Sequence, residues 1–427
     1  MAIRGKLSKT YCPLPFMHSH ASASGRFKPC CNSDVIAGWK YRSTKYNYSE
    51  WFVHPEMEQL RNDLLNGVKN KMCDVCWSQE DIGDDSHRTR YIRRFKDTDI
   101  NNPKITYLDL KLSNECNLAC RMCDYTQSNQ IYKDMLEMEE KKIPLPMNWE
   151  RAANFEQVAN DDMLNVAPKN ILDDIINLLP QLRHLKVTGG EPTITKEFFT
   201  LVDYAIEKDY AKNIILSLTT NGTRLTPSFL DKLKAFKKIR INVSFDGIED
   251  NYEYIRYPFT WKMFEKRMTD VQNYMQGENN NIQSLDFTTT AQLINLELLH
   301  LAEKWVWNKF GNEADLQIQP TIRPFRSSTD FRFLPKHIIE EANYQCQKIN
   351  NKTNYYDCEM LHSALEDIIK NYDSEDMMYY KQEQSLKNMV SDIMNLDRIR
   401  NQNYKIGLGK ETKFWIDDLI TKGVYNV

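Results

Sequence analysis

Apolar and polar positions alternate with a regular rhythm through the middle of the chain. Between Lys104 and Arg323, short runs of β-branched and apolar residues are separated by longer amphipathic stretches. This alternation is typical of repeated βα units around a parallel sheet. Six runs are predicted as strands: ITYLDLKL (105–112), LRHLKVT (182–188), NIILSLTT (213–220), KIRINVSF (238–245), LDFTTTAQL (285–293) and ADLQIQPTI (314–322). They predict an α/β fold with a partial (β/α)6 TIM-like barrel, since a complete barrel needs about eight units.

The flanking regions follow other patterns. Before residue 100 the chain is rich in cysteines and short polar connections, with one amphipathic helix, HPEMEQLRNDLLNG, that ends at Gly67. Beyond residue 330 the segments are polar and helix-prone, and no further strands are expected there. The chain is therefore predicted to divide into a small cysteine-rich module (1–100), a barrel (101–328) and a helical C-terminal region (329–427).

Composition narrows the class of protein. The chain has 427 residues, 41% of them hydrophobic and 27% charged, which favours a globular fold. A net charge of -3 gives no strong field toward nucleic acid or an anionic membrane. The N-terminal sequence lacks an apolar signal segment, and no run of about 18 apolar residues follows it. We expect a cytoplasmic protein that does not span a membrane, and the sequence gives no strong evidence for nucleic acid as a partner.

A reducing compartment changes how the ten cysteines are interpreted, because it disfavours disulfides and favours metal, cluster or catalytic roles. Eight cysteines lie before residue 124. Cys346 and Cys358 stand apart in a polar helical region and are most simply inert buried thiols.

The strongest chemical signal is Cys116-Asn-Leu-Ala-Cys120-Arg-Met-Cys123, directly after the first predicted strand. Loops at this end of barrel strands build active sites. Three thiolates on one loop can hold three irons of a cubane, which leaves the fourth iron open to a cofactor or substrate. A zinc site completed by a distant fourth ligand is the alternative that the spacing alone leaves open.

With its position after the first of six βα strands, this motif resembles the CxxxCxxC loop of the radical S-adenosylmethionine (SAM) enzymes. The resemblance runs from residue 104 to residue 323. It implies a catalytic [4Fe-4S] cluster on Cys116, Cys120 and Cys123, with SAM as second cofactor. Reductive cleavage of SAM then gives a 5′-deoxyadenosyl radical that abstracts hydrogen from a substrate. A one-electron reductant such as a flavodoxin or ferredoxin is implied as a partner.

Three further segments match the family in order. Thr188-Gly189-Gly190-Glu191-Pro192 resembles the GGE segment, whose backbone meets the methionyl amino group of SAM. The alternative for this segment is a tight turn in which two glycines supply backbone freedom. This segment follows the second predicted strand, and the other two, given next, follow the third and the fourth, which strengthens the resemblance.

The remaining segments are implied to contact the ribose or methionyl end of SAM. They are Thr219-Thr220-Asn221-Gly222 and Ser244-Phe245-Asp246-Gly247, with Thr220, Asn221, Ser244 and Asp246 as the contacting residues. Polar turns at strand ends are the alternative for both. Met122 replaces the usual aromatic residue of the family before the third cysteine, and its thioether is expected to pack against adenine.

Arg256, in YIRYP, resembles an arginine near the active site of related enzymes, and a surface salt bridge explains it equally well. Two other polar features receive plainer interpretations. His18 and His20, in PFMHSHASASG, are expected at the surface of a polar loop. The basic segment HRTRYIRRFK (87–96) is expected to be a solvated linker.

The N-terminal cysteines form a second set. Cys12 and Cys30 frame a CX12GX4C arrangement, and Cys73-Asp-Val-Cys76 follows the short helix. This set resembles part of the auxiliary cluster region of SPASM and twitch radical SAM enzymes, although there the region usually follows the barrel. The resemblance implies that Cys12, Cys30, Cys73 and Cys76 bind an auxiliary [4Fe-4S] cluster, with Cys31 as an alternative to Cys30. A structural four-cysteine zinc site is the competing interpretation.

The substrate is expected by analogy to be a peptide or protein side chain, because relatives with an auxiliary cluster often modify peptides. A small molecule such as a nucleotide, sugar or lipid precursor is the alternative. Two other classes of protein stay open: a zinc-binding interaction protein and an electron-transfer protein with two ordinary clusters.

Overall fold

The structure is a computed structural model, and the parts of the chain that it describes are residues 7–22, 25–33, 46–81, 83, 85–145, 169–278, 280–320, 326–350 and 356–424. The chain divides into two units. The first contains Met1–Asn114, Ala159–Leu218 and Ala235–Ile239, and the second contains Glu115–Val158, Thr219–Lys234 and Arg240–Val427. The division predicted from the sequence, at 1–100, 101–328 and 329–427, stays a prediction.

Alternating apolar residues build the sheet of the first unit. Strands β3 (Tyr107–Lys111), β4 (His184–Thr188) and β5 (Ile215–Thr220) are parallel neighbours, and the last two residues of β5 belong to the second unit. Their apolar positions are buried on one face: Leu108, Leu110, Leu185, Val187, Leu216 and Leu218. These strands are three of the six predicted from the sequence.

A strand from the cysteine-rich segment extends this sheet. Strand β1 (His18–Ala21) pairs in parallel with β3, and β2 (Phe27–Lys28) pairs antiparallel with β1. The strand order in the first unit is therefore β2-β1-β3-β4-β5. The expectation that His18 and His20 lie at the surface of a loop is wrong, because both are buried within β1.

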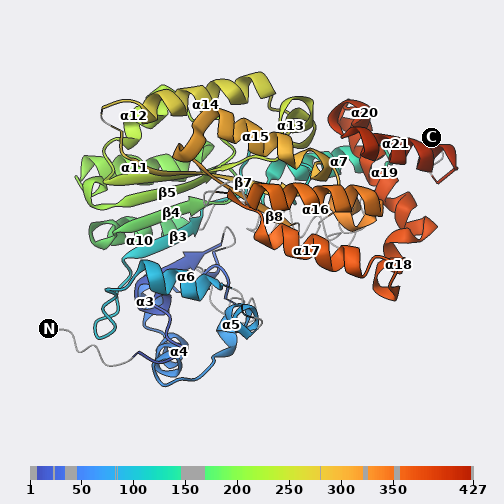
Figure 1. The fold of residues 1–427 in the computed structure, drawn as a ribbon. Helices are drawn as coiled ribbons and strands as arrows, with labels where there is room; N and C mark the ends of the chain where they lie inside the picture. The colour runs from blue at the N-terminus through green and yellow to red at the C-terminus, as the bar shows by residue number, and fades with distance from the viewer. Residues whose placement is uncertain are drawn as a thin grey trace. The chain divides into compact units, whose positions relative to one another are not determined.

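One helix of the first unit begins and ends at the signals expected from its sequence. Helix α4 begins with Pro55 and is followed by Gly67 at φ +83°, as its sequence predicted. Helices α10 and α11 pack against each other beside the sheet (Figure 1). The helices are α1 (Leu14–Met17), α3 (Tyr48–Phe52), α4 (Pro55–Leu65), α5 (Asp74–Asp81), α6 (His87–Arg94), α10 (Lys169–Leu178) and α11 (Lys196–Glu207).

The second unit contains the other predicted strands. Its strands follow the order β6-β7-β8-β9, with bounds Lys238–Ser244, Ile282–Ala291, Asp315–Pro320 and Tyr356–Asp357. The first two residues of β6 belong to the first unit. Strand β9 lies in the region where no strand was expected and adds a short parallel pairing to β8. All six predicted strands are confirmed, and the α/β fold with a mostly parallel sheet is as predicted.

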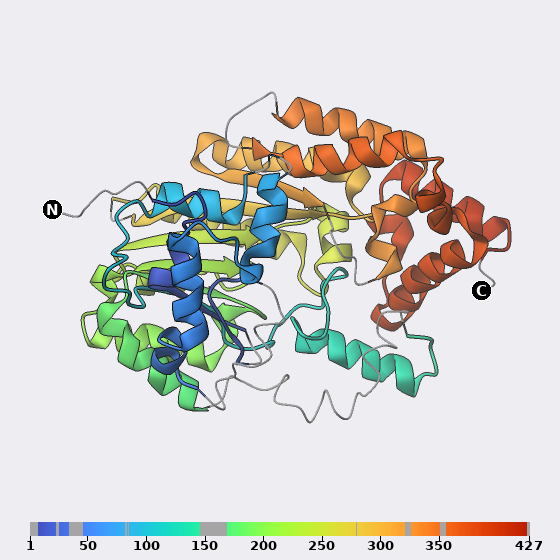
Figure 2. The same ribbon diagram turned by 90° about the horizontal axis from the view of Figure 1, so that it is seen from below.

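Helices dominate the rest of the second unit. Helices α16 and α17 lie side by side and both contact the β8–β9 edge (Figure 1). Helix α7 lies beside the C-terminal helices (Figure 2). The helices are α7 (Asn129–Glu140), α12 (Pro227–Leu233), α13 (Glu249–Ile255), α14 (Trp261–Met275), α15 (Leu299–Phe310), α16 (Lys336–Asn350), α17 (Glu359–Lys370), α18 (Glu375–Lys381), α19 (Glu383–Arg400), α20 (Tyr404–Gly407) and α21 (Lys410–Thr421). Among the described residues, no helix combines the length and apolar character needed to cross a membrane.

Candidate functional site

The three-cysteine loop connects the end of β3 to helix α7 and is fixed at several points in the second unit. The backbone N–H of Ala119 donates to the carbonyl of Tyr257 at 2.7 Å, and that of Arg121 donates to the carbonyl of Ile255 at 3.0 Å. Ser128 caps α7 and donates its hydroxyl to the carbonyl of Leu118 at 2.7 Å. The loop is thereby held by the end of α13 on one side and by the start of α7 on the other.

The thiols of Cys116, Cys120 and Cys123 lie close enough to interact electrostatically. Cys116 and Cys120 are buried and pack with Leu118, and Met122 and Cys123 pack against them. Burial raises the pKa of Cys120 and Cys123, and the neighbouring thiols raise that of Cys123 further. The thiols of Cys120 and Cys123 thus resist ionisation, and a bound metal ion would supply the positive charge that a thiolate needs.

A buried ion pair lies next to this group of thiols. Arg256 follows α13, and its guanidinium donates to Oδ2 of Asp246 at 2.6 Å and to Sγ of Cys120 at 3.6 Å. Asp246 also accepts from the backbone N–H of Thr290 at 2.8 Å. Burial would lower the pKa of Arg256, but the charges of Asp246 and Cys120 raise it above its usual range. Arg256 is only 8% exposed, so the salt bridge that it makes is not a surface one.

The polar segment after β5 reaches the first cysteine. Asn221 donates to Oδ1 of Asn117 at 2.9 Å and lies 3.9 Å from Sγ of Cys116. Thr220 accepts from the backbone N–H of Gly222 at 3.1 Å, which shapes the turn. Ser244 ends β6 and is half-buried. The second unit therefore brings Asn221 and Asp246 to the cysteine loop, while contacts of Met122, Thr220 and Ser244 with SAM stay predictions.

The Gly-Gly-Glu segment follows β4 in the first unit. Gly189 has φ +81°, and a Cβ atom at this position would lie 2.9 Å from Cβ of Lys111. Gly190 also has positive φ, at 49°. Glu191 is fully buried, and its carboxylate accepts from the backbone N–H of Thr193 at 3.0 Å and from its hydroxyl at 2.6 Å. The turn needs all three residues for its own conformation, and their contact with SAM stays a prediction.

Four N-terminal cysteines of the first unit lie close enough for their thiols to interact electrostatically. They lie before α1, after β2, in the turn Lys71–Cys73 and in α5: Cys12, Cys30, Cys73 and Cys76. Burial raises the pKa of Cys73 to about 12, and the interaction with the Cys76 thiol adds to it. The thiol of Cys30 interacts with that of the adjacent Cys31 and with those of Cys12, Cys73 and Cys76. Among the residues described, no three His, Cys, Asp or Glu side chains form a group that could hold a single metal ion.

Cys31 faces a different set of groups. Burial raises the pKa of its thiol, and its main charged neighbours are Asp109 and Lys186. Lys186 donates to Asp109 at 3.0 Å, and Nδ1 of His20 lies 3.6 Å from the same carboxylate. The choice of Cys30 over Cys31 as a ligand stays a prediction.

Arg88 is a buried cation beside the four-thiol group that the sequence did not indicate. It lies in α6, donates to Glu80 at 2.9 Å and to the carbonyl of Tyr11 at 2.7 Å, and lies 4.9 Å from the ring centre of Trp77. Its charge lowers the pKa of Cys12 and Cys73 against the effect of burial. The solvated-linker interpretation of residues 87–96 is therefore wrong for Arg88. The only available signal was its position within a run of arginines.

A protein-family model matches the part of the chain that carries the cysteine loop. Residues 110–280 match the model of the Radical SAM superfamily, a segment that includes Cys116, Cys120, Cys123, the Gly-Gly-Glu turn and Asp246. The match supports the radical SAM superfamily for this part of the chain. It includes neither the N-terminal cysteines nor the C-terminal helices.

Known relatives match parts of the chain. The mycofactocin maturase MftC of Mycolicibacterium smegmatis is 28% identical over 140 residues, which are 33% of this chain and 27% of that protein. The GTP 3′,8-cyclase of Aliarcobacter butzleri is 28% identical over 147 residues, which are 34% of this chain and 36% of that protein. The chain thus spans only about a third or less of either relative. The solved structure of anSMEcpe with bound AdoMet has a TM-score of 0.35 and 16% identity, covering 70% of this chain and 60% of that one.

Proposed function

We propose that the protein is a radical SAM enzyme whose catalytic [4Fe-4S] cluster is bound by Cys116, Cys120 and Cys123. The observation that carries this proposal is the convergence of these three thiols on one loop, fixed by α7 and α13, within the segment that matches the superfamily. When bound, such a cluster supplies one electron for the reductive cleavage of SAM to methionine and a 5′-deoxyadenosyl radical.

The surrounding residues have defined tasks in this proposal. Arg256 holds a positive charge at Cys120, which favours the thiolate form that binds iron. Asp246 balances that charge and is itself fixed by Thr290. Asn221 orders the other side of the loop through Asn117. The side chains of Met122, Thr220 and Ser244 and the Gly189-Gly190-Glu191 turn are assigned to SAM binding.

We further propose that Cys12, Cys30, Cys73 and Cys76 bind an auxiliary [4Fe-4S] cluster. Their mutual thiol interactions and the buried charge of Arg88 support this assignment. Four thiolates would close the coordination of such a cluster and leave it suited to electron transfer. A structural zinc ion is the alternative, and metal analysis separates the two.

A peptide or protein side chain is the proposed substrate, and the similarity to a maturase supports it. The similarity to a GTP 3′,8-cyclase supports a nucleotide as the alternative. A defined peptide mixture and GTP can be offered separately to the reduced enzyme, with 5′-deoxyadenosine as readout. Stimulation by peptides supports the first class of substrate, and stimulation by GTP alone would replace it.

The central experiment measures iron and sulfide in anaerobically reconstituted protein, its electron paramagnetic resonance (EPR) spectrum with and without SAM, and 5′-deoxyadenosine. We expect about eight irons per chain, since each of two cubanes holds four. The variant Cys116→Ala/Cys120→Ala/Cys123→Ala should lose SAM cleavage and about half of the iron. Retained cleavage in this variant would contradict the assignment of the catalytic cluster.

A matched control replaces two cysteines outside both groups. Cys346 and Cys358 are buried near each other in the helical region, with their sulfur atoms 2.7 Å apart. The variant Cys346→Ala/Cys358→Ala should keep both clusters and SAM cleavage. Zinc in place of iron in the wild-type protein would instead support a zinc-binding interaction protein.

A further inference from the structure

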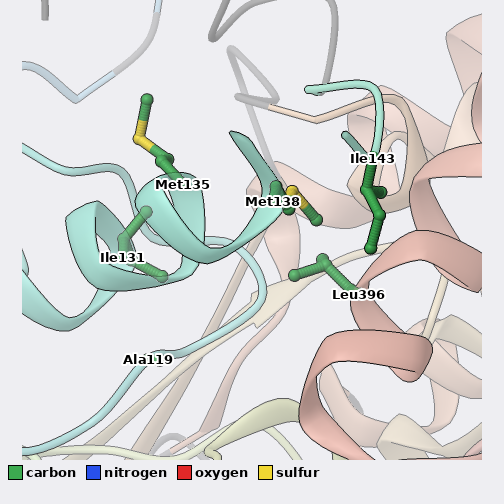
Figure 3. Packing of buried hydrophobic residues seen from close by; sticks show 6 residues of the cluster. All are labelled: Ala119, Ile131, Met135, Met138, Ile143 and Leu396. Atoms are coloured by element: carbon green, nitrogen blue, oxygen red, sulfur yellow. The ribbon is translucent and has the colours of Figure 1, made fainter. Parts of the chain in front are cut away.

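Helix α19, in the C-terminal region, packs directly on the loop that carries the three cysteines. Leu396 of α19 lies in an apolar cluster with Ala119 of the loop and with residues of and after α7: Ile131, Met135, Met138 and Ile143 (Figure 3). Cys123 itself packs against this cluster. Leu396 is completely buried, so this contact excludes water from one side of the loop.

Polar contacts join the same two elements next to this apolar cluster. Arg121, between Cys120 and Met122, has no solvent exposure. Its guanidinium pairs with the carboxylate of Asp397 in α19 and donates to Oε1 of Gln402 at 2.9 Å. It also donates to the carbonyl of Tyr254 at 3.0 Å and stacks 3.6 Å from the centre of that ring. A side chain of the cysteine loop is therefore held from two directions, by α19 and by α13.

Asp397 also fixes the turn that follows α19. Its second carboxylate oxygen accepts from the backbone N–H of Tyr404 at 2.6 Å, at the start of α20. Gln402 donates to the carbonyl of Glu253 at 3.2 Å. One carboxylate thus orients both Arg121 and the turn that carries the second acceptor of Arg121.

The turn between α19 and α20 is also held against α13. Asn251 of α13 donates to the carbonyl of Gly407 at 2.6 Å. A Cβ atom at Gly407 would lie 2.3 Å from Cβ of Tyr254. Only a glycine at this position therefore lets the backbone of α20 approach α13 so closely. Because α13 also accepts the backbone N–H of Arg121, the loop, α13, α19 and α20 form one packed assembly.

We propose that Asp397 is a positioning residue for the catalytic cluster, which it orients and tunes through Arg121. The inference rests on the proposed function and extends it to the C-terminal helices, which lie outside the superfamily match. Arg121 and Asp397 are both buried and compensate each other's charge close to the cluster cysteines. Removing one partner leaves an uncompensated charge and a loosened loop, whereas removing both restores neutrality.

The test compares the reduction potential of the SAM-binding cluster and 5′-deoxyadenosine formation among variants. Asp397→Asn leaves the positive charge of Arg121 uncompensated, which favours the reduced cluster, so we expect a less negative potential. The double variant Arg121→Gln/Asp397→Asn should return the potential toward that of the wild type. A displacement of the loop by about 1 Å should lower SAM cleavage by about 100-fold in Asp397→Asn.

Two variants control for a loss of stability alone. Glu297→Gln removes a carboxylate that caps α21 through Glu411 and Thr412 and touches no part of the cysteine loop. It should leave the potential and SAM cleavage unchanged. Asp397→Glu keeps the charge and should restore most of the cleavage lost in Asp397→Asn. If Asp397→Asn does not fold, Gln402→Met removes an acceptor of Arg121 without stranding a charge and should lower cleavage to a smaller extent.

The outcomes separate this inference from the proposed function. If the wild-type protein cleaves SAM while Asp397→Asn and Gln402→Met match Glu297→Gln in potential, EPR spectrum and cleavage, Asp397 is not a positioning residue. A potential that fails to return in the double variant overturns the electrostatic part of the inference. If the wild-type protein itself neither binds nor cleaves SAM, the proposed function fails first.

Discussion

Cys30 and Cys31 are adjacent in the chain, yet their thiols face different partners. Besides its neighbour Cys31, Cys30 interacts with the thiols of Cys12, Cys73 and Cys76. Cys31 instead interacts with the carboxylate of Asp109 and the ammonium group of Lys186. We therefore expect Cys30, and not Cys31, to complete the four-thiol group.

This difference predicts opposite results for two single substitutions. Cys30→Ala should remove the metal of the N-terminal group, which would lower total iron by about half if that metal is a four-iron cluster. Cys31→Ala should keep the iron content of the wild type. Iron and sulfide analysis after anaerobic reconstitution checks both variants. Equal iron loss in the two variants would mean that the thiols exchange roles.

The energetic effect of crowding around Gly189 can be measured by comparing its replacement with that of Gly67, which has no close neighbour. Both have similar φ angles, +81° and +83°, but only Gly189 has a neighbour, Lys111, in the place of a Cβ atom. Gly67→Ala should cost about 1 kcal/mol of unfolding free energy from backbone strain alone. Gly189→Ala should cost about 1 to 3 kcal/mol more, because Lys111 must move. Chemical denaturation of the two variants, side by side, gives the difference, and equal costs would show that Lys111 adjusts freely.

Burial of His18 should make the free energy of unfolding depend on pH. Its Nδ1 donates to the carbonyl of Pro29 at 2.8 Å, and burial lowers its pKa to about 4, an effect that Asp109 partly opposes and that His20 and Lys186 reinforce. As the pH falls, His18 therefore binds a proton near pH 6.5 in the unfolded chain but only near pH 4 in the folded chain. The stabilisation is complete above pH 6.5 and falls by up to about 3 kcal/mol as the pH decreases toward 4.

Unfolding free energies between pH 7 and pH 4.5 check this expectation. His18→Asn should show a shallower loss of stability than the wild type as the pH falls. His87, whose pKa burial also lowers to about 4, should retain its own contribution in that variant. His300→Asn in helix α15 serves as the matched substitution in the second unit. A profile of His18→Asn as steep as that of the wild type would show that His18 is not buried in its neutral form.

Replacement of Leu396 should reveal how much the C-terminal helices contribute to the stability of the second unit. Leu396→Ala should lower the unfolding free energy by about 2 to 5 kcal/mol, because the methyl groups that lie beside Met138 and Ile143 are lost and a cavity remains (Figure 3). Leu396→Met keeps the volume and should cost less than about 1.5 kcal/mol. Denaturant titrations followed by circular dichroism measure both. A cost for Leu396→Ala below that of Leu396→Met would show that α19 separates easily from α7.

The sequence by itself determined the strands of the central region and the cysteine loop. Alternating apolar residues in Leu108 to Leu110 and in Leu216 to Leu218 specify strands locally, because one face of each must be buried. The spacing of Cys116, Cys120 and Cys123 is equally local, so the motif is visible without a structure. The turn at Gly189 was also recognisable, since its glycines lie directly after a strand.

Only the tertiary structure decided the contacts that join distant segments. Short polar β1 carries His18 and His20 with no apolar alternation, and its place in the sheet comes from pairing with β3 about 90 residues later. Arg121 and Asp397 meet across 276 residues of chain. Such pairings arise when buried charges and apolar surfaces from separate elements find partners in the folded core, and no local pattern encodes that choice.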